Sequence, residues 1–424
     1  MKGIWLLLLL VAAAKAERVF VGDQVVRVNV QSEEHIQLLQ TLEAKQEWEF
    51  ERCEDVPYFP QHSLHCHNRQ PSGLDSPHNL ISVLILKMKS GIVVYLACHI
   101  QELLEKEKAE MKENQMKERS TKSFNFGAYH TLETIYSFMD TLVAQHPNLV
   151  TKEKIGSPMR TGPCMCSSTG GINRPAIWID TGIHSREWVS QATGVWTANK
   201  IATDYGNDDS LTSILNTMDI YMLILANPDG YVYTHTNDRM WRKTRSKISG
   251  SICRGVDPNR NWDAGFGGPG ASSNPCSDSY HGPSAHSEIE VKNVVDLIKK
   301  HGNFKSFISV HAYSQLLMYP YGYTCSDVPH QPELDSVGRA AAQKLTSLYG
   351  TSYKVGSICK IIYQASGGSI DWSYKVGIKY SFAFELRDTG RYGFILPANQ
   401  IIPTASETWL ALKHIMEHVR DHPY

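Results

Sequence analysis

The stretch from Thr181 to Trp188 constrains the fold more than any other part of this chain. It follows an apolar run, 176–180, that predicts a short buried strand, and it precedes a periodic segment, 188–204, that predicts a helix. Between them His184 and Glu187 stand three residues apart, just after a glycine that can turn the chain. Open α/β sheets bind ligands at the carboxyl ends of their strands, and an imidazole with a carboxylate supplies two ligands of a catalytic zinc site. The stretch therefore predicts an α/β fold with a metal site at this turn.

The His-x-x-Glu spacing is not specific by itself. It also occurs at His99, His130, His330 and His414. We interpret these other matches as solvated faces or loops, because short motifs often occur by chance. Only His184 has a strand, a glycine turn and a helix around it. Even there, the hypothesis of a catalytic zinc site needs a third ligand and a general base.

A third ligand can be found at the end of another apolar run. His311 follows residues 306–310, which read as a buried strand. A lone histidine there is more often a satisfied buried residue, but beside His184 and Glu187 it becomes the predicted third ligand. Two imidazoles and one carboxylate leave zinc net positive, which lowers the pKa of its water to about 7.

Glu385 ends a further apolar run, 380–384. A carboxylate in such a place is costly unless it is paired, hydrated or functional. The pattern leaves two interpretations open, which are a general base and an ion pair with Arg387.

Arginines gather in two clusters, 239–243 and 257–262. An arginine fork can bind a carboxylate in bidentate geometry or stabilise a developing oxyanion. Taken singly, each cluster is more often a surface charge.

The chain has 424 residues and a formal charge of −1. The length predicts one large or two unequal domains, and the charge argues against nucleic acid or an acidic membrane surface as the main partner. Residues 1–16 have the basic start, apolar core and small-residue end of a secretory signal peptide. No run is long enough to span a membrane, so we expect a secreted, extracellular protein.

Nine cysteines are compatible with disulfides in a secreted protein, and the odd number leaves at least one over. We predict two pairs. Cys253 and Cys276 bracket a loop rich in Gly, Asn and Pro, and Cys325 and Cys359 bracket one helical segment. The cysteines without an arguable partner are Cys53, Cys66, Cys98, Cys164 and Cys166.

The N-terminal part after the signal peptide begins as a small α/β unit, with a strand within 20–30 and a helix at 34–42. From 46 to 99 the pattern weakens. The His- and Cys-rich tract 59–67 is more consistent with a divergent or poorly ordered segment than with a metal site. Residues 102–119 are highly charged and helix-prone, which fits an exposed connector and a plain solvated helix equally well.

After residue 120, helices and apolar strands alternate, which predicts a mixed, largely parallel twisted sheet flanked by helices on both faces. The predicted strands are 176–180, 220–226, 304–311 and 379–386. The predicted helices are 131–145, 188–204, 287–301, 333–349 and 403–419. Ser287 with Glu290 has the pattern of a capping box, and Gly302 would end that helix.

Several segments together resemble one family. They are His184–Trp188, Asn227–Gly230, Arg239–Arg242, Asp257–Trp262, Ser314–Met318, Ile362–Gly367 and Phe384–Asp388. They closely resemble the zinc carboxypeptidases of the pancreatic A/B group, most of all its A2 type, over about residues 119–424. The pair Cys253–Cys276 matches the disulfide of the group, and Cys325–Cys359 is similar to the additional bridge of the A2 type.

The resemblance implies the chemistry. His184, Glu187 and His311 would bind one Zn²⁺ ion. Glu385 would take a proton from the attacking water and pass it to the leaving amine, and Arg242 would stabilise the oxyanion.

The resemblance also implies the substrate site. The residues that would hold the terminal carboxylate of a peptide or protein are Asn259, Arg260 and Tyr363. The residues that would line the preceding subsites are Arg186, Tyr313 and Phe394. Ile370 would face the departing side chain, where an Asp would instead attract Lys or Arg. With Ala383 and Met318 leaving room in the wall, we predict a graded preference for aromatic ends, then large aliphatic ones.

Members of the family are made with a propeptide that covers the active site until trypsin removes it. The resemblance implies a signal peptide at 1–16, a small α/β activation propeptide at 17–119 and a catalytic domain at 120–424. The protein would be a monomer whose partners are its own propeptide in cis and a trypsin-like activating protease. Lys117 and Arg119 are the candidate cleavage points.

Two segments depart from the family pattern. Residues 46–99 lose the likeness to the propeptide. Residues 158–168 carry two Pro, two Cys and a Gly where the family has an apolar strand, and these are poor strand formers. A third change, Ala312 where relatives usually have Ser, should have a minor effect.

Three alternatives to this function stay open. They are a catalytically silent binding homologue, a zinc amidohydrolase acting on small acylated amino acids, and a poorly folding product. The complete set of ligands and base argues against the first, and the carboxylate clamp beside an apolar pocket argues against the second.

Overall fold

A computed structural model describes residues 24–30, 48–54, 62–68, 94–121, 123–155, 163–171 and 173–424. The predicted signal peptide and the predicted helix at 34–42 lie outside the described residues.

The N-terminal part contains a four-stranded sheet with the order β2-β3-β1-β4. Its antiparallel strands are β1 (Gln24–Val30), β2 (Trp48–Glu54), β3 (His62–Asn68) and β4 (Val94–His99). β1 confirms the strand predicted within 20–30. The other three strands lie in 46–99, where the sequence pattern weakens, so their pairing with β1 and with one another is not evident from local alternation.

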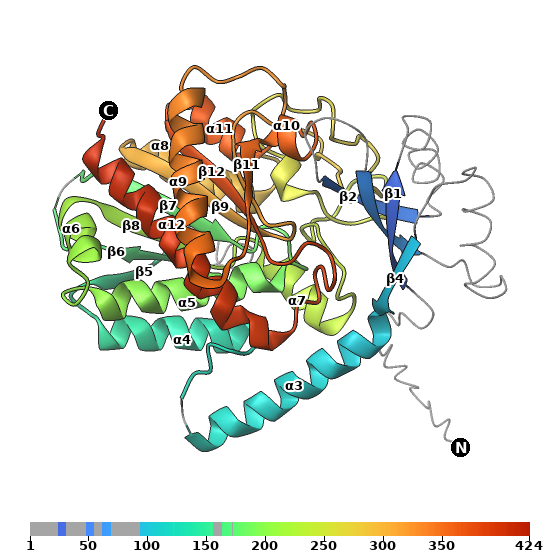
Figure 1. Ribbon diagram of the computed structural model, residues 1–424, viewed down its shortest axis with the longest axis horizontal. Coiled ribbons are helices and arrows are strands. Elements are labelled where there is room, and N and C mark those ends of the chain that lie inside the picture. The colour runs from blue at the N-terminus through green and yellow to red at the C-terminus, as the bar shows by residue number, and fades with distance from the viewer. Residues whose placement is uncertain are drawn as a thin grey trace, which may run out of the picture.

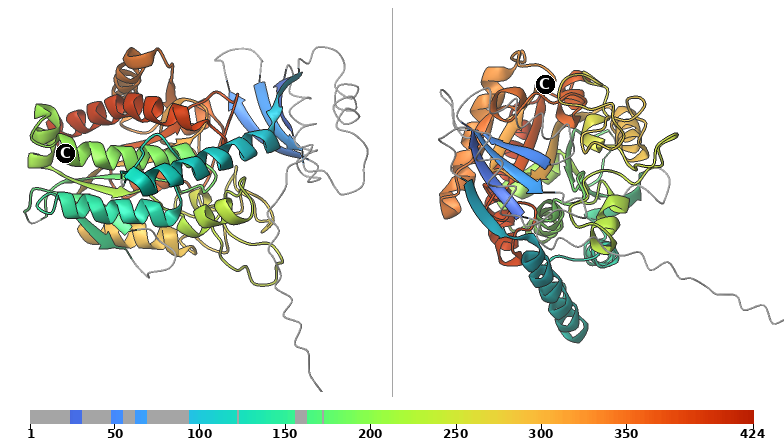
Figure 2. Two further views of the ribbon diagram at one scale, coloured as in Figure 1. Left: turned by 90° about the horizontal axis from the view of Figure 1, so that it is seen from below. Right: turned by 90° about the vertical axis from the view of Figure 1, so that its right-hand side faces the viewer.

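Helix α3 (Ile100–Thr121) joins this sheet to the large domain (Figures 1 and 2). It confirms the helix predicted for 102–119, and it is more than a solvated spacer. Leu104 and Glu107 are buried, and Glu107 forms a 2.7 Å ion pair with Arg239 of the large domain. One side of α3 is therefore docked, while Lys117 and Arg119 lie in its last turns.

The large domain is built on an eight-stranded sheet with the order β11-β10-β12-β9-β7-β8-β6-β5 (Figure 1). The strands are β5 (Val150–Lys154), β6 (Pro163–Ser167), β7 (Ala176–Thr181), β8 (Asp219–Leu223), β9 (Phe304–Ala312), β10 (Leu316–Tyr319), β11 (Lys354–Ser357) and β12 (Tyr380–Leu386). The central strands β8, β7, β9 and β12 are parallel, and β10, β6 and β5 introduce antiparallel pairs. The prediction of a mixed, largely parallel sheet is confirmed.

Helices cover both faces of this sheet (Figure 1). Alternate residues of β7 show the two layers, because Ile177 and Ile179 pack into one apolar cluster and Trp178 packs into the other. The first cluster receives α4 (Leu132–Gln145), α5 (Trp188–Asp204), α6 (Asp209–Thr217), α9 (Gln331–Tyr349) and α12 (Ile401–Asp421). The second receives α8 (Ile289–His301), α10 (Ile358–Ile361) and α11 (Ser369–Lys375). Shorter elements in the loops are α7 (Pro228–Thr236) and the 3₁₀ turns η1 (Pro258–Arg260) and η2 (Ala398–Gln400).

The predicted capping box at Ser287 is wrong. Helix α8 starts at Ile289, its cap residue is Glu288, and no side chain caps it. The Ser287 hydroxyl instead accepts a hydrogen bond from Asn261 Nδ2 at 2.9 Å, so a tertiary contact has replaced the local one. The predicted end of the helix is confirmed, since Gly302 adopts φ 71°.

The segment 158–168 does contain a strand, so the prediction that it is poor strand material is wrong for residues 163–167. β6 pairs with β5 on one side and β8 on the other. Pro163 is its first residue, a place where a missing N–H is tolerated, and Met165 and Cys166 are buried.

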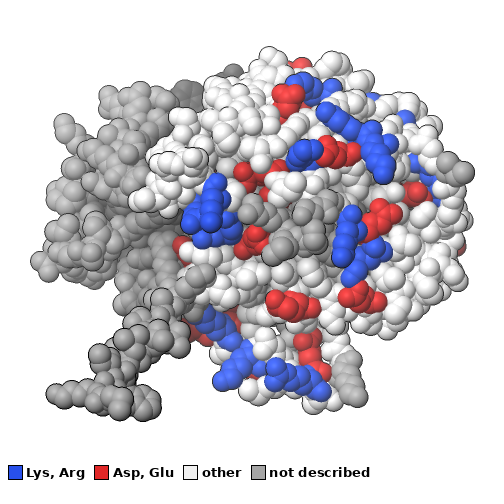
Figure 3. Space-filling model, turned by 180° about the vertical axis from the view of Figure 1, so that it is seen from behind, with Lys and Arg blue, Asp and Glu red and all other residues white. Residues whose placement is uncertain are grey.

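Both predicted disulfides, Cys253–Cys276 and Cys325–Cys359, are present. Cys166 is a buried free thiol, and burial raises its pKa to about 12. Among the described helices, none combines the length and apolar character that crossing a bilayer requires. On the face in Figure 3, basic and acidic side chains are interspersed, in keeping with the near-zero formal charge.

Candidate active site

The loop that carries His184 and Glu187 is held at the carboxyl end of β7. Gly182 adopts φ 67°, and a Cβ there would meet the Gln191 side chain at 2.6 Å, so this turn requires glycine. The Gly182 N–H donates to Ser190 Oγ at 3.1 Å, which fastens the turn to α5. The predicted arrangement of strand, glycine turn and helix is confirmed.

The structure brings the three predicted metal ligands together. His184 Nδ1 lies 2.7 Å from Glu187 Oε1 and 3.1 Å from His311 Nδ1, and His311 Nδ1 lies 3.3 Å from Glu187 Oε2. The candidate ligand atoms all lie within 4.8 Å of one another, and all three residues are buried. Two imidazole nitrogens and a carboxylate aimed at one point fit a catalytic zinc ion, which takes three protein ligands and keeps a position for water.

The charge states also fit a metal. Burial by itself would raise the pKa of Glu187, but the attraction of His184 lowers it below the ordinary value. Burial lowers the pKa of His311. Glu187 is therefore anionic and His311 neutral near pH 7, and these are the forms that ligate metals.

Asp257 connects a candidate ligand, His184, to two arginines, although the sequence analysis gave it no role. Its Oδ1 lies 3.1 Å from His184 Nε2, and its Oδ2 accepts hydrogen bonds from Arg242 Nη2 at 3.0 Å and Nε at 3.1 Å. Burial alone would raise the pKa of Asp257, but Arg242 and Arg260 hold it well below its usual range. The sequence did carry one sign of these contacts. Asp257 is an acidic residue inside a basic cluster, where it can pair with the arginines.

Glu385 and Arg242 both lie close to the ligands. Glu385 is aligned with His311 across the parallel pair β12–β9, so both reach the same edge of the sheet. Arg242 Nη1 lies 3.7 Å from Glu187 Oε1. Arg387, which could have neutralised Glu385, donates through Nε to Glu407 of α12 at 2.7 Å.

The predicted upstream subsite residues form one group. The guanidinium of Arg186 stacks 4.2 Å from the ring of Phe394, and the rings of Tyr313 and Phe394 lie 4.9 Å apart. Arg186 also donates to Asp278 at 3.2 Å, an acidic partner that the sequence did not reveal.

The residues predicted to bind the terminal carboxylate are held by the start of α11 and by the loop that contains Gly270. Asn259 Oδ1 accepts the Ser369 N–H at 2.9 Å. Arg260 donates through Nε to Gly270 O at 2.7 Å, and its guanidinium lies 5.9 Å from the Tyr363 ring. Tyr363 itself is half-buried.

The predicted specificity pocket is apolar. Ile370 is 2% exposed and belongs to the same cluster as Met318 and Ala383, which face each other across β10 and β12. These apolar neighbours suit an uncharged side chain at the end of a substrate.

Residues 135–411 match the family model described as zinc carboxypeptidase. The chain belongs to the zinc carboxypeptidase family. It is 59% identical to carboxypeptidase A2 of Mus musculus over 411 residues, which is 96% of each chain. It is 53% identical to carboxypeptidase A1 of Homo sapiens over 428 residues, which covers both chains completely. The crystal structure of thrombin activatable fibrinolysis inhibitor matches 95% of this chain and all of its own, with 32% identity and a TM-score of 0.82.

This zinc carboxypeptidase is therefore a metallocarboxypeptidase, a peptide hydrolase of the pancreatic-type A group. The family resemblance predicted from the sequence is confirmed, and so is the fold. Its described residues include the His184, Glu187 and His311 group, which could hold the metal that the family name implies.

Proposed function

We propose that this metallocarboxypeptidase is a secreted zymogen whose active form removes single residues from the C-termini of peptides and proteins. It prefers aromatic ends, then large aliphatic ones. The observation that carries the proposal is the convergence of three buried ligand atoms, within 4.8 Å of one another, beside Arg242 and Asp257.

The catalytic roles follow from the charges around this point. His184, Glu187 and His311 would hold a zinc ion, which would supply Lewis-acid chemistry for the scissile carbonyl and the attacking water. Glu385 accepts the proton of the attacking water and then donates it to the leaving amine. The Arg242 guanidinium, oriented by two hydrogen bonds to Asp257, donates to the developing oxyanion.

Exopeptidase specificity requires recognition of a free terminal carboxylate. Arg260 can offer its remaining donors to that carboxylate in bidentate geometry, because its Nε is already fixed on Gly270 O. Asn259 and Tyr363 complete the clamp. The apolar surroundings of Ile370 then favour Trp and Phe over charged terminal residues.

Two features support a zymogen. Residues 1–16 resemble a signal peptide, and α3 is anchored by the buried ion pair of Glu107 with Arg239. Arg239 also donates to Arg186 O and Phe394 O, both at 2.8 Å, so α3 is connected through Arg239 to the proposed upstream subsites. Cleavage after Lys117 or Arg119 would separate α3 from the catalytic domain.

The test is to treat the secreted protein with trypsin in the presence of zinc. Mass spectrometry would then follow matched peptides ending in Trp, Leu, Lys or Asp. We expect loss of one terminal Trp, abolished by a chelator and by Glu385→Gln. Preferential loss of Lys would contradict the role of Ile370, and failure to release any residue would contradict the proposed function.

A further inference from the structure

His311 is connected to a second buried carboxylate that none of the roles above includes. Its Nε2 lies 3.0 Å from Ser309 Oγ, and that hydroxyl donates to Asp180 Oδ1 at 2.7 Å. The other oxygen, Asp180 Oδ2, accepts from Trp178 Nε1 at 2.8 Å. All four residues are 4% exposed or less.

The directions of these hydrogen bonds are determined by the groups involved. An ionised carboxylate only accepts hydrogen bonds, so the Ser309 hydroxyl must donate its single hydrogen to Asp180. Ser309 Oγ can then only accept from His311, which places the imidazole proton on Nε2. The lone pair is left on Nδ1, the nitrogen that faces His184 and Glu187 at 3.1 and 3.3 Å.

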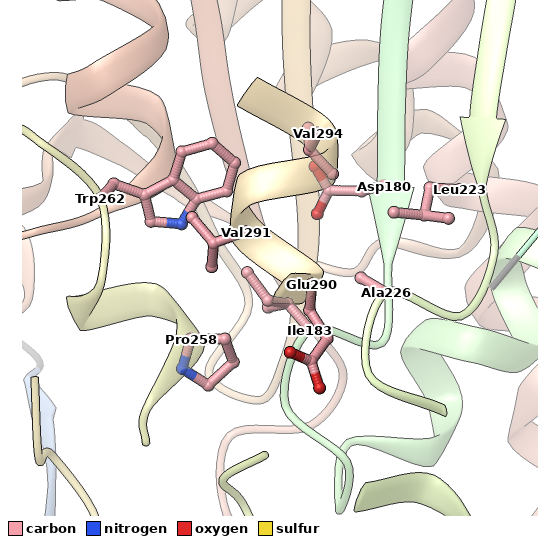
Figure 4. Close-up of a pocket in the computed structure, with 9 residues that line it drawn as sticks. All are labelled: Asp180, Ile183, Leu223, Ala226, Pro258, Trp262, Glu290, Val291 and Val294. Atoms are coloured by element: carbon pink, nitrogen blue, oxygen red, sulfur yellow. The ribbon is translucent and has the colours of Figure 1, made fainter. Parts of the chain in front are cut away.

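Among the described residues, those that bind Asp180 are Ser309 and Trp178 and include no Lys or Arg, so a structural ion pair does not explain it. It lines a small pocket between β7 and α8, whose walls include Ile183, Leu223 and Val294 (Figure 4). Neither Lys nor Arg occurs among the residues lining that pocket. A carboxylate in such surroundings is costly unless hydrogen bonds or a nearby positive charge compensate it.

The two histidines are thus oriented in related ways. His184 contacts Asp257 directly, whereas His311 reaches Asp180 through one hydroxyl. We propose that Asp180, acting through Ser309, is a positioning residue that holds His311 with Nδ1 directed at the metal. This rests on the proposed zinc site, since outer hydrogen-bond partners of this kind tune metal ligands.

The test uses the full chain loaded with zinc and the variant Ser309→Ala, which breaks the connection and leaves Asp180 in place. Ser306→Ala is a matched control, because Ser306 is equally buried on β9 but donates to Tyr380 O at 2.9 Å. The readouts are the rate of zinc transfer to a chromogenic chelator and the visible spectrum of the Co²⁺-substituted protein. We expect about 10- to 100-fold faster zinc loss and an altered Co²⁺ spectrum for Ser309→Ala alone.

A second variant, Asp180→Asn, keeps the size of the side chain but points an amide donor at Trp178 Nε1 or Ser309 Oγ. It should release zinc as fast as Ser309→Ala, and the double variant should be no faster than either, because both break one connection. If Asp180→Asn does not fold, the Ser309→Ala comparison decides alone.

Wild-type zinc retention and an unchanged Co²⁺ spectrum in Ser309→Ala would overturn the inference while leaving the proposed function intact. Equal losses in Ser306→Ala and Ser309→Ala would also overturn it, because the cause would then be a cavity in β9. A wild-type chain that binds no zinc would overturn both the inference and the proposed function.

Discussion

The centre of the large sheet and its β5–β6 edge are built on different principles. β7, β9 and β12 are parallel, almost wholly buried, and end at the candidate site. β5 and β6 pair antiparallel, and most of β5 is exposed or half-buried. The described part of the unusual segment, 163–168, belongs to this second region. The candidate site residues named above all come from outside β5, β6 and β8.

Because of this difference, catalysis and stability should depend on different parts of the sheet. β8 stands between β6 and β7, so β6 does not pair with the strand that leads into the ligand loop. We therefore expect substitutions at the centre to change catalysis and substitutions at the edge to change stability. The alternative of a poorly folding product therefore concerns the β5–β6 edge and not the centre of the sheet.

The largest effect should come from Glu385→Gln at the centre. Glutamine has the same size but cannot accept the proton of the attacking water, so kcat should fall about 10²- to 10⁴-fold, roughly 3–5 kcal/mol in barrier height. The thermal midpoint should be unchanged. Glu153→Gln on exposed β5 is the control and should keep full activity. A Glu385→Gln enzyme with wild-type kcat would refute the role of the base.

A pH effect should follow from Asp371, at the start of α11. Its carboxylate accepts the N–H groups of Gly322 and Tyr323 at 2.9–3.0 Å, yet burial raises its pKa from 3.8 to about 7. The folded state therefore binds more protons than the unfolded state between these values. The stability from this group is present below about pH 4 and is lost as pH rises through 7, by on the order of 4 kcal/mol.

Asp371→Asn removes this proton linkage. The measurement is the free energy of unfolding of the zinc-loaded protein from pH 4.5 to 8, as wild type minus variant. That difference should decrease as pH rises and level off above pH 7. A difference independent of pH would show that Asp371 titrates normally.

At the edge, Met165→Ala should lower the free energy of unfolding by about 3 kcal/mol, because it leaves a cavity under β6, where Met165 is 2% exposed. The kcat/KM of the folded enzyme should not change. Denaturant unfolding and steady-state kinetics on the same samples would check this. A tenfold fall in kcat/KM without unfolding would contradict the expectation that the edge affects stability and not catalysis.

The smallest effect should come from Ile370→Val, which widens the proposed specificity pocket by one methylene. A terminal Leu should lose contact while Trp fills the space, so the ratio of kcat/KM for Trp over Leu should rise several-fold, about 1 kcal/mol. Ile378→Val is the control, since Ile378 is buried in the same cluster but precedes the amino end of β12. An equal shift in both variants would show that the pocket lies elsewhere.

Much of the fold could be predicted where a local signal was strong. β7 and α5 were located closely because an apolar run, a glycine and a helical period follow one another. β5, β6, β10 and β11 were not predicted, because four or five residues carry little pattern and their pairing depends on neighbouring strands. Ser287 shows the opposite error, since a valid local cap was taken over by Asn261, 26 residues away.

In the candidate site, too, local signals could be predicted and tertiary contacts could not. By itself, the sequence determined which groups could act and where, because His184, Glu187, His311 and Glu385 each follow an apolar strand. It could not show which nitrogen of each histidine faces the metal. β9 is buried on both faces, so no alternation marks the side on which Ser309 lies. The tertiary structure decided that orientation through Asp257 and Asp180, since these carboxylates reach their partners from 73 and 129 residues away, where no local pattern can report the contact.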